Sequence, residues 1–191
     1  MADVVSSDFV IRGARLADTA DIIDLVNGLA VDQVMLPRSP ASVIENIRDF
    51  VVAEVGDHFG GCGALAVIWS DIAEIRSIAV APEHRSLGLG RAMAEHLLAE
   101  AEELGVARVM AFTYVPEFFE RLGFRVVDHA ALPHKVFNDC LNCPKFHCCD
   151  ETAVLKELRP VADASAQWPE GGPLSLPRPG TPLPRTPRPA R

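Results

Sequence analysis

The sequence predicts one mixed α/β (α+β) domain, built on a mostly antiparallel sheet with one central parallel crossover and helices on both faces. Two strand-like runs flank the turn signal Gly56-Asp57-His58-Phe59, which favours an antiparallel hairpin. A strand, an amphipathic helix and another strand then follow within residues 72–113, and this order requires a parallel crossover. The part of the chain before the proline-rich end is long enough for one hydrophobic core, and too short for two comfortable domains.

The first part of the chain predicts a short strand and two helices. Phe9–Ala14 is strand-like, and Asp18 can cap a first helix because apolar residues at helical spacing follow it. Ser39 can cap a second helix that has Pro40 at its first position. The expected apolar face of the second helix consists of Val43, Ile44, Ile47 and Phe50.

Three strand-like runs follow, and the third carries charges in its interior. The runs are Phe50–Val55, Gly61–Trp69 and Ile72–Val80. Because side chains alternate along a strand, one face of the third run is expected to carry Ile72, Glu74, Arg76, Ile78 and Val80. A carboxylate and a guanidinium in mid-strand indicate that this face lines a wet cleft.

The clearest helix in the sequence is Leu89–Leu104. Its apolar residues recur at helical spacing, and Gly105 can end it. The other predicted elements are the strand Val106–Thr113, the short helix Glu117–Arg121 and the strand Phe124–Val127.

The charge divides the chain into an acidic body and a basic tail. The chain has 26 acidic residues against 18 Lys and Arg, which gives a net charge of −8. Residues 159–191 hold nine of the 15 prolines and carry +3, so residues 1–158 carry −11. We expect residues 1–158 to form the domain and residues 159–191 to be a disordered tail, since the tail lacks the periodicity needed to bury a core.

The composition also argues against several kinds of partner and location. An acidic body does not suit nucleic acid as the main partner. No apolar run approaches the length of about 18 residues that a membrane span needs. The start MADVVSSDF lacks the basic and apolar regions of a secretory signal, which favours a reducing cytoplasm. A homodimer is left open.

The strongest motif joins the third strand to the long helix. It reads Val80-Ala-Pro-Glu-His-Arg85-Ser-Leu-Gly88-Leu-Gly90-Arg91. The glycines let the backbone approach a ligand closely, and free N–H groups at a helix N-terminus favour an anion. Arg85 can add a charge-assisted contact. The pattern favours a pyrophosphate site over a turn that only begins a helix, although it is neither a Gly-Lys-Ser/Thr loop nor G-x-G-x-x-G.

Two segments of this region resemble the Gcn5-related N-acetyltransferase (GNAT) superfamily. Arg85-x-x-Gly88-x-Gly90 after a strand resembles its acetyl-CoA motif, and Phe118-Phe-Glu-Arg-Leu-Gly-Phe124 resembles its second signature. The resemblance covers about residues 9–158 and implies the GNAT fold with acetyl-CoA as co-substrate. It implies that the backbone of Ile78, Ala79 and Val80 pairs with pantetheine. The amides that it assigns to the pyrophosphate are those of Arg85, Ser86, Leu87, Gly88, Leu89, Gly90 and Arg91.

Four further segments are similar to the short amino-acid N-acetyltransferases related to N-acetylglutamate synthase. They are residues 35–39, 72–80, 112–119 and 132–136. This resemblance implies acetyl transfer to the α-amino group of L-glutamate, in arginine biosynthesis. The alternatives are another small amine such as glutamine, or a non-catalytic regulator that binds CoA or zinc.

Glutamate brings two carboxylates, so an acidic protein that binds it needs local cations. Arg38 and Lys135 are expected to bind these carboxylates, and an arginine suits a bidentate contact. Arg76 is expected either to reach the substrate or to pair with Glu74. The alternative for all three is an ordinary surface cation.

An amino group must lose a proton before it attacks a thioester. The resemblance implies that Glu74 is the general base, acting through water, and a salt bridge with Arg76 is its alternative role. Many relatives carry a Tyr where this chain has Phe119, which has no proton to give. Tyr114, the only tyrosine, is a candidate donor to the leaving thiolate, with packing as its alternative. The thiolate could also leave without an acid.

A cysteine cluster lies near the end of the body. Cys140, Cys143, Cys148 and Cys149 lie within ten residues, together with His147. Structural zinc, reduced thiols and a disulfide are the three readings, and the spacing does not match a standard two-pair zinc site. The fifth cysteine, Cys62, is expected to be a small strand residue.

Overall fold

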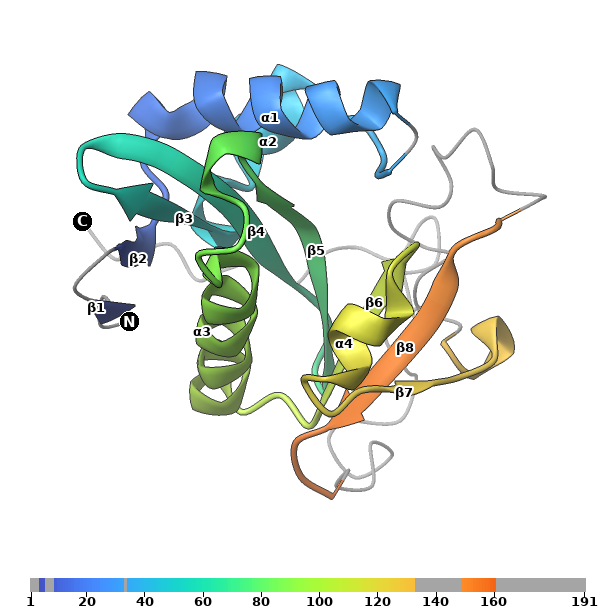
Figure 1. Cartoon of the computed structure of the whole chain (residues 1–191). Helices are drawn as coiled ribbons and strands as arrows, with labels where there is room; N and C mark the ends of the chain where they lie inside the picture. The colour runs from blue at the N-terminus through green and yellow to red at the C-terminus, as the bar shows by residue number, and fades with distance from the viewer. Residues whose placement is uncertain (1–3, 6–8, 33, 133–148, 161–191) are drawn as a thin grey trace, which may run out of the picture. The chain divides into compact units, whose positions relative to one another are not determined.

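The computed structural model describes residues 4–5, 9–32, 34–132 and 149–160, and these residues form a sheet with helices on both faces (Figure 1). Within them the sheet has eight strands in the order β1-β2-β3-β4-β5-β6-β8-β7. Only β5 and β6 pair in parallel, and every other neighbouring pair is antiparallel, which confirms the predicted fold class. The strands are β1 Val4–Val5, β2 Val10–Gly13, β3 Phe50–Val55, β4 His58–Trp69, β5 Ile72–Val80, β6 Arg108–Thr113, β7 Arg125–Val126 and β8 Thr152–Glu157.

The helices cover the sheet from two sides. Val52 and Phe50 point to the face that α1 and α2 cover, whereas Val51 and Ala53 pack with α3 on the other face. This alternation follows from the two-residue period of a strand and gives the domain two apolar layers. The helices are α1 Thr19–Val31, α2 Pro40–Glu45, α3 Leu89–Leu104 and α4 Pro116–Glu120. Short 3₁₀ turns occupy Leu16–Asp18, Ile47–Asp49, Pro82–His84 and His129–Ala131. No helix among the described residues is long and apolar enough to cross a bilayer.

The second helix is shorter than the sequence predicts. Ser39 caps it as expected, because its hydroxyl oxygen accepts a hydrogen bond from the Ser42 amide. The helix ends at Glu45, and a 3₁₀ turn then leads into β3 at Phe50. The predicted four-residue apolar face is therefore wrong: Val43 is buried but Ile44 is 49% exposed.

Asp18 lies directly before α1 but does not cap it. Its carboxylate instead accepts two hydrogen bonds from Arg12, at 2.8 and 2.9 Å, because a guanidinium offers a stronger bidentate partner than helix amides do. Arg12 is 9% exposed and also contacts Glu54 of β3 at 2.5 Å. This cluster ties the start of α1 to the outer strands of the sheet.

Acid should weaken this cluster. The hydrogen bonds from Arg12 lower the pKa of Asp18, so the folded state favours its charged form. The resulting stability is present above the unfolded-state pKa of about 4 and is lost as pH falls through the lower folded-state pKa. We expect Asp18→Asn to have a lower free energy of unfolding at pH 7 and to lose less of it between about pH 5 and 3. Urea unfolding across this range measures both, with the exposed Asp24→Asn as control. Parallel pH curves for Asp18→Asn and wild type would contradict the expectation.

Candidate active site

The parallel strands β5 and β6 separate in the middle of the sheet. Three rungs join them, Ile72 with Arg108, Ala73 with Val109 and Glu74 with Met110. Beyond Glu74, β5 continues to Val80 and β6 to Thr113 without pairing to each other, and Figure 1 shows them diverging. The middle of the sheet therefore opens into a gap between β5 and β6.

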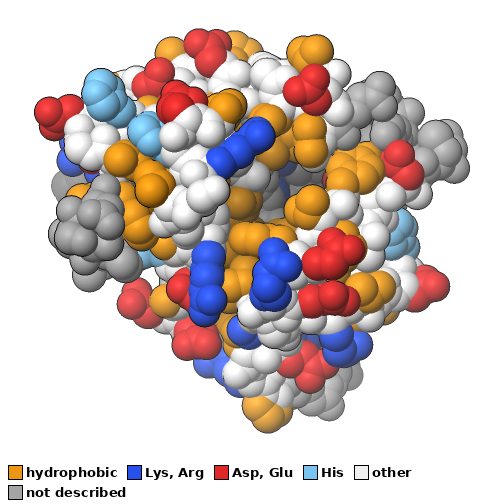
Figure 2. All heavy atoms as spheres, viewed as in Figure 1, with side chains coloured by type: hydrophobic (Ala, Val, Ile, Leu, Met, Phe, Trp, Pro, Cys, Tyr) orange, Lys and Arg blue, Asp and Glu red, His pale blue; other side chains and the backbone are white. Residues whose placement is uncertain are grey.

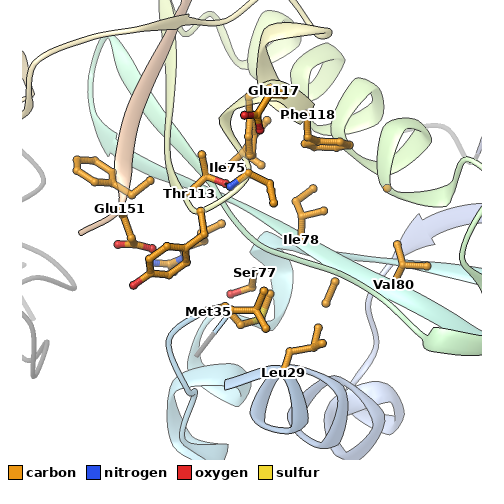
Figure 3. Close-up of a pocket in the computed structure, with 18 of the residues that line it drawn as sticks. Leu29, Met35, Ile75, Ser77, Ile78, Val80, Thr113, Glu117, Phe118 and Glu151 are labelled. Atoms are coloured by element: carbon orange, nitrogen blue, oxygen red, sulfur yellow. The ribbon is translucent and has the colours of Figure 1, made fainter. Parts of the chain in front are cut away.

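A cavity of about 660 Å³ occupies this gap. Figure 3 shows Leu29 and Met35 on one side of it, Glu117 and Phe118 on the other, and Ser77 and Ile78 between them. The cavity is also lined by residues 75–80 of β5 and by residues 112–115, which follow the part of β6 that pairs with β5. In Figure 2 basic side chains lie above and below the hollow, and the arginines that line the cavity are Arg76, Arg85 and Arg121.

A bulge in β5 turns consecutive residues toward the cavity. The pairing with β4 shifts between Cys62–Ala79 and Ala64–Arg76, and Ser77 takes the left-handed value φ = 56°. After the bulge, Ile78 and Val80 pack with the α3 layer and Ala79 with the α1 layer. The expectation that Ile78 and Val80 share a face with Glu74 is therefore wrong, because one extra residue inverts the alternation.

Cys62 of β4 contacts this bulge. Its thiol sulfur lies 3.6 Å from the carbonyl oxygen of Ser77, to which it donates. Burial raises the pKa of the thiol to about 12, so the proton needed for this contact stays in place at neutral pH. Cys62 is thus a small buried strand residue, as expected, with an additional contact at the bulge.

The loop after β5 has the backbone geometry of an anion site. Ser86 and Gly88 have φ values of 76° and 80°, and α3 begins at Leu89 without a side-chain cap on its first turn. A second hollow of about 330 Å³ lies against this loop, and Arg85, Gly90 and Arg91 are among its linings. N–H groups at a helix start, two left-handed residues and two arginines fit a phosphate group.

Gly61 permits the close approach of β4 to β5 beside the cavity. A Cβ atom at Gly61 would lie 2.5 Å from the carbonyl oxygen of Ala79, which is backbone and cannot rotate away. We expect Gly61→Ala to displace β5 at Ala79 and to lower the free energy of unfolding by about 1–3 kcal/mol. Gly13→Ala is the matched strand control, because a Cβ atom there meets nothing within 4 Å. Urea unfolding measures the effect, and equal free energies of unfolding for the two variants would contradict the prediction.

Glu74 lies at the closed end of the gap. It belongs to the last rung between β5 and β6 and is 2% exposed. It directly precedes Ile75, the first β5 residue of the cavity lining, and does not itself line the cavity. Arg76 lines the cavity, and its guanidinium lies 3.7 Å from the Asp49 carboxylate. Burial raises the pKa of Asp49, and the charge of Arg76 opposes this.

Tyr114 lines the cavity, whereas Arg38 does not line it and contacts it through Ser77. The Nε atom of Arg38, in the loop before α2, lies 3.4 Å from the hydroxyl of Ser77. Tyr114 lines the cavity, and its hydroxyl donates to Asp150 at 2.6 Å. Phe119 is 5% exposed and stacks edge-on against Phe118, so it is mainly a core residue. Lys135 lies outside the described residues.

Three of the four predicted metal ligands also lie outside the described residues, namely Cys140, Cys143 and Cys148. Cys149 is exposed, and its sulfur lies 4.0 Å from a carboxylate oxygen of Glu151. Within the described part of the chain, no group of three or more His, Cys, Asp or Glu side chains could hold a metal ion. The zinc hypothesis stays a prediction.

The sequence interpretation missed several cavity residues. Arg121 and Glu117 line the cavity from the segment around α4, and Glu151 lines it from the residues before β8. Arg121 falls inside the second signature, so its charge was visible in the sequence. Glu151 carried no such signal, because its place depends on the unpredicted strand β8.

The chain matches the acetyltransferase (GNAT) family over residues 29–124 and belongs to that family. It is 41% identical over 153 residues to an uncharacterized N-acetyltransferase of Chlorobaculum tepidum, covering 80% of this chain and 99% of the relative. It is 38% identical over 133 residues to the amino-acid acetyltransferase of Mycobacterium tuberculosis, covering 68% and 76%.

Solved structures agree with the fold. A Mycobacterium tuberculosis protein in complex with CoA and a compound designated NLQ is 31% identical, with a TM-score of 0.68 over 78% of this chain and 98% of that one. N-acetylglutamate synthase of Neisseria gonorrhoeae, complexed with coenzyme A and N-acetyl-glutamate, is 24% identical, with a TM-score of 0.73. That match covers 82% of this chain and 37% of the synthase, and it shows the fold alone. The chain is thus a GNAT N-acetyltransferase.

Proposed function

We propose that this enzyme transfers the acetyl group of acetyl-CoA to the α-amino group of L-glutamate, as in the first step of arginine biosynthesis. The observation that supports the proposal is that Arg76 lines the cavity and that Arg38, which does not line it, contacts the cavity residue Ser77. Arg76 lines the cavity next to Ser77, and Arg38 contacts the Ser77 hydroxyl at 3.4 Å. Two guanidinium groups in an acidic protein suit an acceptor with two carboxylates. The similarity to an amino-acid acetyltransferase supports the same conclusion.

Acetyl-CoA would occupy the other end of the same cavity. In the proposal, the backbone of Ile78, Ala79 and Val80 pairs with the pantetheine arm, where β5 no longer pairs with β6. The amides of residues 85–91 hold the pyrophosphate, and Arg85 contributes charge. Arg121 lines the cavity and adds a further cation for the phosphates. This assignment places the thioester between the loop and the two acceptor arginines.

The proposed reaction joins the amine nitrogen to the acetyl carbon and breaks the carbon–sulfur bond. The ammonium group loses two protons on its way to the amide: the first passes through water to Glu74, next to Ile75 at the closed end of the gap, and the second leaves the nitrogen after attack and passes to solvent. Relay through water suits a carboxylate that does not itself line the cavity. Tyr114 is the candidate donor to the thiolate. The Tyr114 hydroxyl donates a hydrogen bond to Asp150, so this hydrogen bond must break before Tyr114 can protonate the sulfur of CoA. The alternative is that CoA leaves as the unprotonated thiolate.

A steady-state assay of CoA release tests the acceptor. Purified enzyme is given acetyl-CoA with glutamate, glutamine, aspartate or lysine. Glutamate is expected to have the highest kcat/KM, since only it and aspartate carry two carboxylates and aspartate is one methylene shorter. A higher kcat/KM with glutamine than with glutamate would show that glutamine is the preferred acceptor. No turnover with any amino acid would overturn the proposed function and favour a CoA-binding regulator.

A further inference from the structure

One side chain fastens the backbone of Arg38 to α1. The amide nitrogen of Asn27 donates to the Arg38 carbonyl at 3.0 Å, and the Arg38 N–H donates to the Asn27 carbonyl oxygen at 2.8 Å. A single asparagine thus satisfies both backbone groups of Arg38, as a neighbouring strand would. The loop between α1 and α2 has no regular secondary structure around Arg38, so these two bonds help to hold the residue in place.

A second contact fixes the Arg38 side chain. Its Nε atom lies 3.4 Å from the hydroxyl of Ser77, the residue with φ = 56° in the β5 bulge. The Cys62 thiol holds the carbonyl of the same serine at 3.6 Å. Figure 3 shows Ser77 beside Met35, where the loop before α2 meets β5. Ser77 also lines the cavity, so Arg38 is tied to the cavity wall itself.

We propose that Asn27 and Ser77 are positioning residues for acceptor recognition, which hold the Arg38 guanidinium at the acceptor end of the cavity. The inference rests on the proposed function, in which Arg38 binds an acceptor carboxylate. A free arginine side chain and loop would have to be ordered when the acceptor binds, and this ordering weakens binding. Asn27 carries no charge, so its loss changes the position of the cation and not the charge of the site.

The experiment replaces Asn27 and follows the two substrates separately. Asn27→Ala removes both hydrogen bonds to Arg38. Asn27→Asp keeps the oxygen that accepts from the Arg38 N–H, but it replaces the donor to the Arg38 carbonyl with a carboxylate oxygen. Each variant is expected to raise the acceptor KM about tenfold, with kcat and the KM for acetyl-CoA changed less than about twofold. Ser77→Ala is expected to act in the same direction with a smaller change, since it loses one long hydrogen bond.

Asn46→Ala is the matched control. Asn46 also donates its side-chain amide to a backbone carbonyl, that of Ser42 at 2.8 Å, and it does not line the cavity. A general loosening of the helices would therefore change both asparagine variants alike. The acceptor KM of Asn46→Ala is expected to match wild type even where its thermal stability falls.

A double-mutant cycle shows whether Asn27 acts through Arg38. In an Arg38→Met background, Asn27→Ala is expected to add less than about twofold to the acceptor KM, because no guanidinium is left to position. An undiminished effect in that background would overturn the proposal. An unchanged acceptor KM in Asn27→Ala, or an equal rise in the KM for acetyl-CoA, would overturn it too.

Amide hydrogen exchange separates this inference from the proposed function. The Arg38 amide is expected to exchange at least about tenfold faster in Asn27→Ala than in wild type, since its acceptor is gone. If glutamate is not acetylated, the proposed function fails, and the KM series is run with the amino acid that turns over fastest. If no amino acid turns over, the same series is run as calorimetric binding of glutamate to the CoA-bound enzyme. Unchanged Arg38 exchange in Asn27→Ala would remove the structural basis of the proposal.

Discussion

Replacing Glu74 with Gln is expected to lower kcat at neutral pH by at least about 100-fold, the range typical of a lost general base. The glutamine has almost the same shape and can still hydrogen-bond, so the buried site at the last rung between β5 and β6 should remain filled. The KM for acetyl-CoA should stay within about twofold, because the phosphate loop is unaltered.

The pH dependence of the Glu74→Gln variant gives a second reading. Without a base, the rate depends on the fraction of acceptor that is already a free amine in solution, and this fraction rises with pH. The variant should therefore recover activity as the pH is raised toward 9, more steeply than wild type does. Glu102→Gln, an exposed carboxylate change on α3, serves as control. Full activity of Glu74→Gln at neutral pH would show that Glu74 is not the general base.

Replacing Arg38 with Met is expected to raise the KM for glutamate about 10- to 100-fold, the effect of losing a charge-assisted hydrogen bond to a carboxylate. The change retains most of the side-chain length and removes the charge. Arg38→Lys should fall between Met and wild type, since a lysine restores the charge without the bidentate geometry. Acetyl-CoA kinetics should change little, because the proposed role of Arg38 is to bind the acceptor.

Arg125→Met is the control for the loss of an arginine. Arg125 of the exposed strand β7 pairs with Glu157 of β8, and the Arg125 side chain is 62% exposed, so its removal should leave both KM values unchanged. Initial-rate kinetics with varied glutamate and fixed acetyl-CoA measure the effect. An Arg38→Met variant with an unchanged glutamate KM would remove Arg38 from the acceptor site.

The periodic elements of this chain were predictable from the sequence. Ile72–Val80 and Leu89–Leu104 have the predicted bounds, because alternation and helical spacing are written locally in the side chains. The loop between them was also predictable, since Arg85, Gly88 and Gly90 lie within six residues of one another at a helix start. The strand Thr152–Glu157 was not predicted; it pairs with β6 and β7, and its central residues are buried in apolar clusters formed with distant segments.

For the proposed acceptor end of the cavity, the sequence predicted which charged residues contribute but not how they are arranged. The sequence shows Arg38, Glu74 and Arg76 as charged residues, but it does not indicate that Asn27 contacts Arg38 or that Asp49 pairs with Arg76. Nothing near Ser77 in the sequence indicates a bulge, since its left-handed backbone arises from the register between β4 and β5. That one-residue shift moved Ile78 and Val80 to the opposite face from the one predicted.

The sequence by itself determined the fold class, the glycine-containing loop before α3 and the membership of an acetyltransferase family, because each depends on residues close together in the chain. Tertiary structure alone decided that β5 and β6 separate after Glu74, and which side chains then meet in the gap. The physical reason is that strand register and strand separation depend on the pairing of distant segments. A local pattern can predict a strand, but it does not specify how far that strand will follow its neighbour.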